Sequence, residues 1–441
     1  MAHIAVVESN RFGLRLLEAA KVGGHEVSFL YSKKRAFFTD TSENRELIKL
    51  SDRVITLEDS TDPDHLRSFL KELHSRSPIA TVICVEEYAV QAATKAAAAL
   101  SIPATSAGAV ALARNKFALR QKIASAGIPC GRAVLVRDRS TLRSAMSEVG
   151  YPVVIKPNRS SESLMAYVVR GSEDTADVLT SLEAEWARLG DVRREQVSEE
   201  FVCETYFEGP LVSADIIKSS AGTFPLAVSE RMQPTNDPTI ELGTILPPSF
   251  GDDARLACSE YAAAIVETVG LDRGIFHVEM ILTTEGPRLV ELNPRLMGGS
   301  LPYLYDVLMD MSVHKLLIDV HLGLPIAPTR LPKNQCTFAI RLQSKEDGRI
   351  ARLPELFELP LGGLKVLRRE ILANANEDVK DETILGRLYL QMYESHAIWE
   401  KIDRLLDAYE DAFEVALMRP KHLRRVDQRT DNFGSSLNVD S

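Results

Sequence analysis

The sequence predicts an α/β fold. Over the first hundred residues, short apolar runs alternate with segments in which apolar residues recur at helical spacing, a pattern typical of a parallel sheet covered by helices. The chain has 441 residues, which is too long for one ordinary domain. Hydrophobic residues make up 45% of it and charged residues 26%, as in folded soluble proteins. We therefore expect several α/β domains.

The first predicted domain, residues 1–112, opens with a β–α–β pattern. Its expected strands are 3–9, 25–32, 52–59 and 80–87, and its expected helices are 11–24, 62–77 and 88–100. The turn at residues 8–13 reads Glu-Ser-Asn-Arg-Phe-Gly and lacks the glycine-rich fingerprint of a dinucleotide site. We interpret this domain as a Rossmann-like scaffold that binds no dinucleotide.

Two further domains and a tail follow. In residues 113–326 we expect helices at 111–127, 140–149 and 306–323, a strand at 151–157, and a strand pair at 273–282 and 287–293 joined by a Thr-Thr-Glu-Gly hairpin turn. Residues 327–420 are predicted to form a small α/β subdomain with strand-like runs at 336–344, 363–372 and 386–393 and a helix at 396–415. The tail, 421–441, is basic and then polar, which predicts disorder.

Charge and cysteine content exclude several classes of protein. The net charge is −10, which argues against a nucleic-acid partner, although a few local lysines could still hold a phosphate. The five cysteines are scattered and include no CxxC pair, so neither a disulfide framework nor a zinc site is expected. No signal peptide and no membrane-spanning run is evident. These features predict a cytoplasmic protein without a membrane partner.

The strand pair carries a candidate metal site. Alternation in Leu-Val-Glu-Leu-Asn places Leu289, Glu291 and Asn293 on one face, and the hairpin brings Glu279 close to them. Two carboxylates and an amide oxygen suit Mg²⁺, and a shared Glu291 would suit two ions about 4 Å apart. The alternative is a solvated hairpin face. His277 on the same strand is interpreted as a packed histidine rather than a base.

Two lysines and a polar loop form a candidate phosphate site. Lys156 ends an apolar strand, and Lys116 lies upstream in the same region. Lysines act as point charges on phosphates while metals bridge them, although either lysine could instead be a solvated terminus. The loop after Lys156 has no glycine but offers the hydroxyls of Ser160, Ser161 and Ser163. A plain polar turn is the alternative for this loop.

The order of these motifs resembles the ATP-grasp superfamily of carboxylate–amine ligases, and within it the L-amino-acid ligase branch, which makes dipeptides and related amides. The motifs are "ARNK" (113–116), "PVVIKP" (152–157), "ETYFEGPLVSAD" (204–215), "HVEM" (277–280) and "VELNPRLMGG" (290–299). The resemblance covers residues 1–330 well and extends loosely to about 420. It implies an ATP-grasp fold between an N-terminal scaffold domain and a small C-terminal subdomain.

The resemblance also implies a role for each matching residue. Lys116 and Lys156, with the loop serines 161 and 163, would contact ATP phosphates. Glu204, with the backbone of Tyr206 and Phe207, would recognise adenine. Glu279, Glu291 and Asn293 would bind two Mg²⁺ ions, with Mn²⁺ as a substitute. Arg295 would steady the transferring phosphoryl group, and the N–H groups of Gly298 and Gly299 would approach the carboxylate substrate.

The implied activity is ATP-dependent amide formation through an acyl-phosphate, with ADP and phosphate released. Its partners would be a small-molecule carboxylate and amine, such as amino acids, and a homodimer is the family expectation. The sequence departs from the family pattern at two places. Leu211 falls where many relatives have a ribose-binding glutamate, and the loop after Lys156 lacks the expected glycines. Two alternatives stay open: the same chemistry on a non-amino-acid carboxylate, and a nucleotide-binding protein without turnover.

The substrate pocket is less clearly encoded. The segment 229–249 carries Arg231 and Glu241 among prolines and threonines, and these side chains could bind a substrate carboxylate and a substrate ammonium, respectively. The alternative for both is an ion pair. His314 and His321 lie seven residues apart on one expected helix face, where packing is favoured over a metal site because no third ligand is evident.

Overall fold

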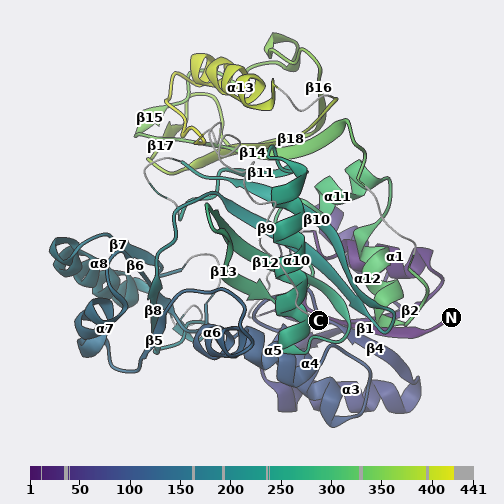
Figure 1. The fold of residues 1–441 in the computed structure, drawn as a ribbon. Coiled ribbons are helices and arrows are strands. Elements are labelled where there is room, and N and C mark those ends of the chain that lie inside the picture. The colour runs from purple at the N-terminus through teal and green to yellow at the C-terminus, as the bar shows by residue number, and fades with distance from the viewer. Residues whose placement is uncertain are drawn as a thin grey trace.

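The computed structural model describes residues 1–421 except 11, 34–37, 39, 161–163, 191–193, 235–236, 238, 327–330 and 394–396. The predicted α/β fold is confirmed. Figure 1 shows a large sheet in the middle, an N-terminal unit below it, a smaller lobe to one side and the C-terminal strands above. The tail predicted to be disordered lies outside the described residues, apart from Lys421. No helix among the described residues is long and apolar enough to span a bilayer.

The N-terminal unit is built on a parallel sheet with the strand order β3-β2-β1-β4. The strands are β1 (His3–Val7), β2 (Glu26–Ser32), β3 (Arg53–Leu57) and β4 (Ile79–Ile83), and the helices are α1 (Arg15–Val22), α2 (Ser42–Lys49), α3 (Pro63–Arg76) and α4 (Val90–Ala99). Strand β1 is buried along its whole length, because helices cover both faces of the sheet. All four strands were expected, whereas α2 was not.

The predicted helix 111–127 is two helices, α5 (Ala107–Ala113) and α6 (Lys116–Ser125). The break falls at Asn115, which has an extended backbone and accepts a hydrogen bond from the N–H of Ala118 (2.9 Å) through its side chain. Asparagine caps helices well because its side chain satisfies an otherwise unpaired N–H group. The break places Lys116 at the start of α6, next to the neighbouring lobe.

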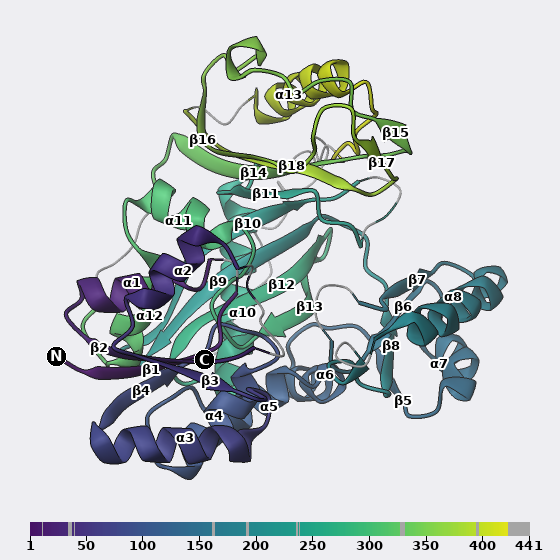
Figure 2. The ribbon, with the colours of Figure 1, turned by 180° about the vertical axis from the view of Figure 1, so that it is seen from behind.

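That lobe contains a four-stranded antiparallel sheet with the order β5-β8-β6-β7. It consists of β5 (Ala133–Val136), α7 (Leu142–Val149), β6 (Val153–Pro157), β7 (Tyr167–Val169), α8 (Thr175–Arg188) and β8 (Phe201–Thr205), with short 3₁₀ turns at Arg139–Thr141 and Ser172–Asp174. It has a hydrophobic core of its own. Figure 2 shows the lobe standing apart from the large sheet, and we call it the lid lobe.

The large sheet is antiparallel, with the order β13-β12-β9-β10-β11-β14-β18-β16. Its first five strands are β9 (Leu211–Ser219), β10 (Gly222–Met232), β11 (Gly243–Leu246), β12 (Gly274–Thr283) and β13 (Gly286–Asn293). Helix α10 (Asp252–Val269) packs on one face of β9 and β10, and α12 (Val313–His321) packs against β9 and β12 from the face that also meets the N-terminal unit. The sheet is therefore a rigid, buried platform.

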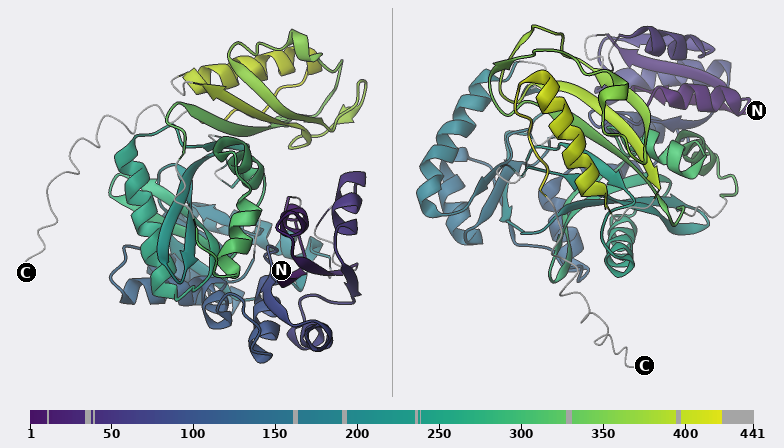
Figure 3. Two further views of the ribbon diagram at one scale, coloured as in Figure 1. Left: turned by 90° about the vertical axis from the view of Figure 1, so that its right-hand side faces the viewer. Right: turned by 90° about the horizontal axis from the view of Figure 1, so that it is seen from above.

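The C-terminal strands continue this sheet across the expected boundary at residue 326. Strand β11 pairs with β14 (Gln335–Gln343), which is followed in the sheet by β18 (Ile384–Tyr393) and β16 (Leu364–Ile371). Helix α13 (Ile398–Phe413) covers these strands and shares a core with them (Figure 3). A small ribbon, β15 (Gly348–Arg349) with β17 (Asp378–Val379), and a 3₁₀ turn at Leu356–Glu358 complete the chain.

The predicted helix 306–323 is also interrupted. Helix α11 (Leu301–Met309) ends where Asp310 adopts a left-handed conformation (φ 48°), and Ser312 then caps α12. A residue with positive φ cannot continue a right-handed helix. His314 and His321 both lie on α12 and are buried.

Candidate active site

The predicted metal ligands lie on the β12–β13 hairpin. Glu279 pairs directly with Glu291, and Asn293 pairs with His277, so the side chains of these residues share one face of the sheet. A β-bulge shifts the register next to Glu279, and Met280 then pairs with Leu289. The prediction that Leu289 shares the face of Glu291 is therefore wrong. Leu289 is buried in the core on the other face, because a bulge inserts one extra residue and reverses the alternation.

The extra residue of the bulge is Val290, and its carbonyl group anchors two cations. It accepts hydrogen bonds from Lys156 Nζ (3.1 Å) and from Arg120 Nη2 (2.7 Å). Arg120 was not among the predicted site residues. The sequence nevertheless contained a signal for it. Arg120 follows Lys116 by four residues, so the two side chains share one face of the helix. Both side chains are buried on α6.

Carboxylates of the site neutralise both predicted phosphate-binding lysines. Lys116 Nζ lies 2.6 Å from Glu291 Oε1 and donates to the carbonyl of Ser160 (3.1 Å). Lys156 forms an ion pair with Glu204, and Arg120 Nε lies 3.1 Å from the second oxygen of the same carboxylate. Burial alone would raise the pKa of Glu204, but Arg120 and Lys156 outweigh burial and lower it. The glutamate therefore stays ionised.

One pocket between the lid lobe and the large sheet gathers most of the predicted nucleotide-binding residues. Its wall includes Lys116, Lys156, Glu204, Tyr206, Phe207, Glu279 and Glu291. Apolar side chains such as Val154, Val168 and Ile281 complete the wall, and Leu211 is among them. Apolar walls with a few convergent charges are typical of cofactor sites. Ser161 and Ser163 lie outside the described residues, whereas Ser160 lines the pocket.

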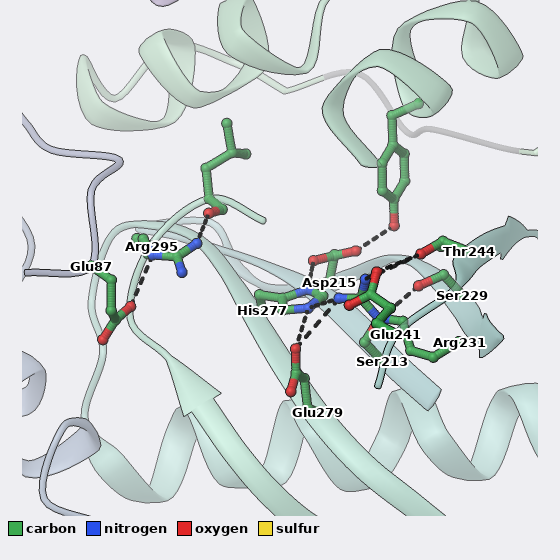
Figure 4. Close-up of polar contacts among 12 residues, drawn as sticks. Glu87, Ser213, Asp215, Ser229, Arg231, Glu241, Thr244, His277, Glu279 and Arg295 are labelled. Carbon is green, nitrogen blue, oxygen red and sulfur yellow. Dashed lines mark hydrogen bonds and ion pairs between the residues drawn. The ribbon is translucent and has the colours of Figure 1, made fainter. Parts of the chain in front are cut away.

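The buried Arg231 forms an ion pair with the partly exposed Glu241 beside the hairpin (Figure 4). Arg231 Nη1 lies 2.9 Å from Glu241 Oε1 and donates to the hydroxyl of Thr244 (3.1 Å). Its Nη2 atom lies 2.9 Å from His277 Nε2 and 3.4 Å from Glu279 Oε1. The guanidinium thus contacts a predicted metal ligand, a contact that the sequence did not reveal.

Behind this pair, His277 connects to a fully buried carboxylate. Its Nδ1 atom lies 2.7 Å from Asp215 Oδ1, and the hydroxyl of Tyr305 donates to Asp215 Oδ2 (2.6 Å). Burial alone would raise the pKa of Glu279, but the neighbouring His277 and Arg231 lower it to about 2. Glu279 is therefore a carboxylate at neutral pH, which is the form that binds a metal.

Arg295 follows the hairpin and reaches the N-terminal unit. Its Nε atom donates to Glu87 Oε2 (2.8 Å), and its Nη1 atom donates to the carbonyl of Leu296 (2.9 Å). Gly298 lies beside it, since a Cβ atom there would sit 3.5 Å from Arg295 Nη1, and Gly299 has a φ of +61° that favours glycine. Glu87 was not predicted, although it follows the carboxyl end of β4, where α/β sheets usually bind ligands.

The donor set of the hairpin fits Mg²⁺. Glu279, Glu291 and Asn293 supply hard oxygen ligands on one face, and an ionised Glu279 matches the charge preference of the metal. Nowhere among the described residues do three His, Cys, Asp or Glu side chains form a complete metal site. Mg²⁺ usually takes only one or two carboxylates and completes its shell with waters and substrate phosphates.

The lid lobe stands beside an antiparallel sheet, and the acids Glu279 and Glu291 share one pocket with Lys116 and Lys156. This arrangement agrees with an ATP-grasp fold. Residues 149–302 match the family model of the ATP-grasp domain, and residues 17–104 match that of the ATP-grasp N-terminal domain. The chain belongs to the ATP-grasp superfamily. The predicted superfamily is confirmed.

The relatives include several amide-forming ligases. The chain is 25% identical to dapdiamide A synthase of Enterobacter agglomerans over 44% of this chain and 45% of the relative, and 23% identical to alanine–anticapsin ligase of Bacillus amyloliquefaciens over 47% and 46%. It is 21% identical to the L-arginine-specific L-amino acid ligase of Bacillus subtilis over 60% and 62%. The matches thus span about half of the length of the first two relatives and somewhat more of the third.

Solved structures share the fold along almost the whole chain. An L-amino acid ligase from Bacillus licheniformis superposes with a TM-score of 0.73 at 16% identity, covering 96% of this chain and 99% of that one. Biotin carboxylase from Campylobacter jejuni superposes with a TM-score of 0.63 at 15% identity, covering 94% and 92%. At these identities the likeness concerns the fold, which serves more than one substrate class.

Proposed function

We propose that the protein is an ATP- and Mg²⁺-dependent ligase that joins a carboxylate to an amine through an acyl-phosphate, releasing ADP and phosphate. The observation that carries this proposal is the convergence of the acid pair Glu279 and Glu291 with Lys116 and Lys156 in one pocket. The amide-forming activities in the names of the relatives support amino acids as the substrates.

In the first step, an oxygen of the substrate carboxylate attacks the γ-phosphorus of ATP, and ADP leaves with the electrons of the broken P–O bond. Lys116 and Lys156 would hold the phosphates, and Arg295 would neutralise charge on the transferring group. Bound Mg²⁺, held by Glu279, Glu291 and Asn293, would supply charge neutralisation between carboxylate and triphosphate. The contribution of the protein is mainly positioning and electrostatic stabilisation.

In the second step, a neutral amine attacks the acyl carbon, phosphate leaves with the electrons of the broken C–O bond, and the nitrogen passes its extra proton to the departing phosphate to give the amide. The N–H groups of Gly298 and Gly299 would face the acyl group. Water must stay out, because it would hydrolyse the acyl-phosphate and waste ATP. We assign this exclusion to closure of the lid lobe on the platform.

The ion pairs among the residues of the pocket fit this use. Lys116 is paired with Glu291, and Lys156 is paired with Glu204. Binding of a triphosphate would offer each lysine a new anion, and the freed Glu291 would become available to a metal. Buried charges without partners are costly, so such exchange keeps every charge compensated before and after binding.

For the amine substrate we favour Glu241 over Arg231 as the direct contact. The Glu241 side chain is 36% exposed, whereas that of Arg231 is 7% exposed and already contacts Glu241, Thr244, His277 and Glu279. A carboxylate beside a pocket can receive a substrate ammonium through charge-assisted hydrogen bonds. Arg231 would then orient Glu241, and a substrate carboxylate could bind it only by displacing that partner.

The proposal extends to the remaining expectations. The substrates would be small molecules in the cytoplasm, two Mg²⁺ ions would act together with Mn²⁺ as a substitute, and the chain would form a homodimer. Glu204, with the backbone of Tyr206 and Phe207, would hold adenine. The serines at 161 and 163 would cover the phosphates.

A second candidate function is a nucleotide-binding protein without turnover. The observation that favours it is Leu211, which lines the pocket at the position where the family resemblance implies a ribose-binding glutamate. A leucine side chain cannot accept a hydrogen bond from ribose. ATP binding would then be weak or serve regulation rather than catalysis.

A panel of carboxylate and amine pairs separates these functions. ADP and phosphate release are measured for each pair with ATP and Mg²⁺, and product mass identifies the bond formed. Substrate-dependent ADP release with an amide product supports the ligase. Measurable ATP binding without ADP release for any pair supports the second candidate. An active pair that contains no amino acid would move the substrate assignment to another carboxylate.

A further inference from the structure

Glu87, a residue of the N-terminal unit, joins two arginines from other parts of the chain. Its Oε2 atom accepts from Arg295 Nε (2.8 Å), and its Oε1 atom lies 3.1 Å from Arg114 Nε. The Glu87 side chain is only 9% exposed. Arg114 is fixed in turn by Gln91, whose side-chain oxygen accepts from Arg114 Nη1 at 3.3 Å.

The electrostatic surroundings keep Glu87 ionised. Burial would raise the pKa of the carboxyl group, but Arg295, Arg114 and Lys116 outweigh burial and lower the pKa. A buried carboxylate between two guanidinium groups forms charge-assisted hydrogen bonds, which are shorter and stronger than neutral ones. Both contacts therefore hold their geometry firmly.

These contacts fix the plane of the Arg295 guanidinium. Glu87 engages Nε and the carbonyl of Leu296 engages Nη1 (Figure 4), whereas no hydrogen bond within the described part of the chain involves Nη2. Two anchored nitrogens define the orientation of a planar group. The third nitrogen is thus aimed in a set direction before any ligand arrives, which is the form of preorganisation that stabilises developing charge.

We propose that Glu87 is a positioning residue for Arg295, and that Arg114 holds Glu87 in place for this purpose. The N-terminal unit, of whose described residues none lines the nucleotide pocket, thereby completes the active site. The inference rests on the proposed function, because it assigns Arg295 to the transferring phosphoryl group. It makes the loop after β4 part of the catalytic apparatus rather than a scaffold.

Glu87→Gln tests the inference by kinetics. Glutamine keeps the size of the side chain but presents an NH₂ group to one arginine, so Arg295 loses its fixed plane. We expect kcat to fall roughly 10- to 100-fold, since misplacement by about 1 Å can cost that much, with the KM for ATP changed less than about threefold. Glu72→Gln is the matched control, because Glu72 pairs with Arg76 on the surface of the same unit, and its kcat should not change.

A double-mutant cycle separates positioning from a structural role. If Glu87 acts through Arg295, adding Glu87→Gln to Arg295→Ala should cause no further loss of kcat. An equal loss in both backgrounds, or full activity of Glu87→Gln, would overturn the inference. If Glu87→Gln does not fold, Arg114→Gln replaces it, and its smaller loss of kcat should likewise vanish in the Arg295→Ala background.

A spectroscopic measurement keeps the inference independent of turnover. In ¹⁵N-correlated NMR spectra of the full chain, the Nε–H signal of Arg295 is assigned by its absence in Arg295→Lys. We expect this signal to shift and to lose exchange protection in Glu87→Gln but not in Glu72→Gln. If the wild type releases no ADP with any substrate pair, the proposed function fails, and an unmoved signal would still refute the positioning of Arg295.

Discussion

The two acids of the hairpin lie side by side but have different partners. Glu291 pairs with Lys116, which comes from helix α6 beside the lid lobe. Glu279 contacts Arg231 and His277, which belong to the same sheet and are backed by Asp215. The partner of Glu291 is a cation that a phosphate could recruit, whereas the partners of Glu279 are built into the platform. Glu291 can therefore exchange its partner when a phosphate binds, whereas Glu279 is held by residues of its own sheet.

The largest expected effect comes from Glu291→Gln. Removal of this charge takes away a shared metal ligand and the counter-charge of Lys116, so ADP release should fall on the order of 10³-fold, the upper range for loss of one electrostatic contact. Thermal unfolding should change little, because the site lies at the edge of the core. Glu285→Gln, on the exposed turn of the same hairpin, is the control with normal turnover. Retained turnover in Glu291→Gln would remove the metal assignment.

Arg231→Met tests whether Glu279 is fixed by its sheet partners. Breaking a buried ion pair leaves a charge uncompensated, so the free energy of unfolding at pH 7 should fall by about 3 kcal/mol. Arg288→Met breaks an exposed pair with Glu285 and should cost less than about 1 kcal/mol. Urea unfolding curves of the three proteins measure both values.

The same variant has a pH dependence of defined sign. In the wild type the pKa of Glu279 is lowered from 4.5 to about 2, so its stabilising contribution is present above pH 4.5 and is lost as pH falls toward 2. In Arg231→Met the acid is buried without its cation, and protonation relieves the cost. The stability gap between wild type and variant should therefore shrink between pH 5 and pH 3. An unchanged gap would show that Arg231 does not stabilise the ionised form of Glu279.

Arg295→Ala should lower kcat by about 10²-fold if the guanidinium stabilises developing charge. The KM for ATP should change less, because Arg295 does not line the nucleotide pocket. Arg295→Lys retains the charge but not the planar fork, so its kcat should lie between those of the wild type and the alanine variant. Steady-state ADP release measures all three, and full activity of Arg295→Ala would refute the role.

The smallest effect concerns the nucleotide itself. Leu211→Glu would place a carboxylate in the pocket wall, where it could accept hydrogen bonds from ribose. ATP should then bind about threefold to tenfold more tightly, the usual net gain from one hydrogen bond. Calorimetry with ATP and 2′-deoxy-ATP provides the check, since the gain should shrink for the analogue. Equal affinities before and after the substitution would mean that ribose recognition does not pass through this position.

The sequence alone predicted the local structure around the site well. The hairpin that brings Glu279 close to Glu291 and Asn293 was predicted from alternation and a turn motif, and the structure contains that strand pair. Strand β6, which delivers Lys156, was equally clear from its apolar run. The superfamily followed from the order of five motifs, because spacing along the chain survives where overall identity is low.

Other features depended on contacts between distant segments. The bulge at Val290 placed the Leu289 side chain on the opposite face of the sheet from the one predicted. The register of a strand is set by its pairing with the neighbouring strand, and composition alone does not reveal it. Strand β11 also pairs with β14, so the large sheet continues across the domain boundary expected at residue 326. This pairing joins segments that are far apart in the sequence.

The sequence by itself thus determined most of the strands and helices on which the proposed site residues lie, because periodicity and turn residues act over short distances. Only the tertiary structure decided which charges meet. Glu87 and Arg295 are 208 residues apart, and the buried contacts among Arg231, His277 and Asp215 bring together three separate strands. Such pairs form because a charge buried by the fold must find an opposite charge, and the fold, not the local sequence, brings that partner within reach.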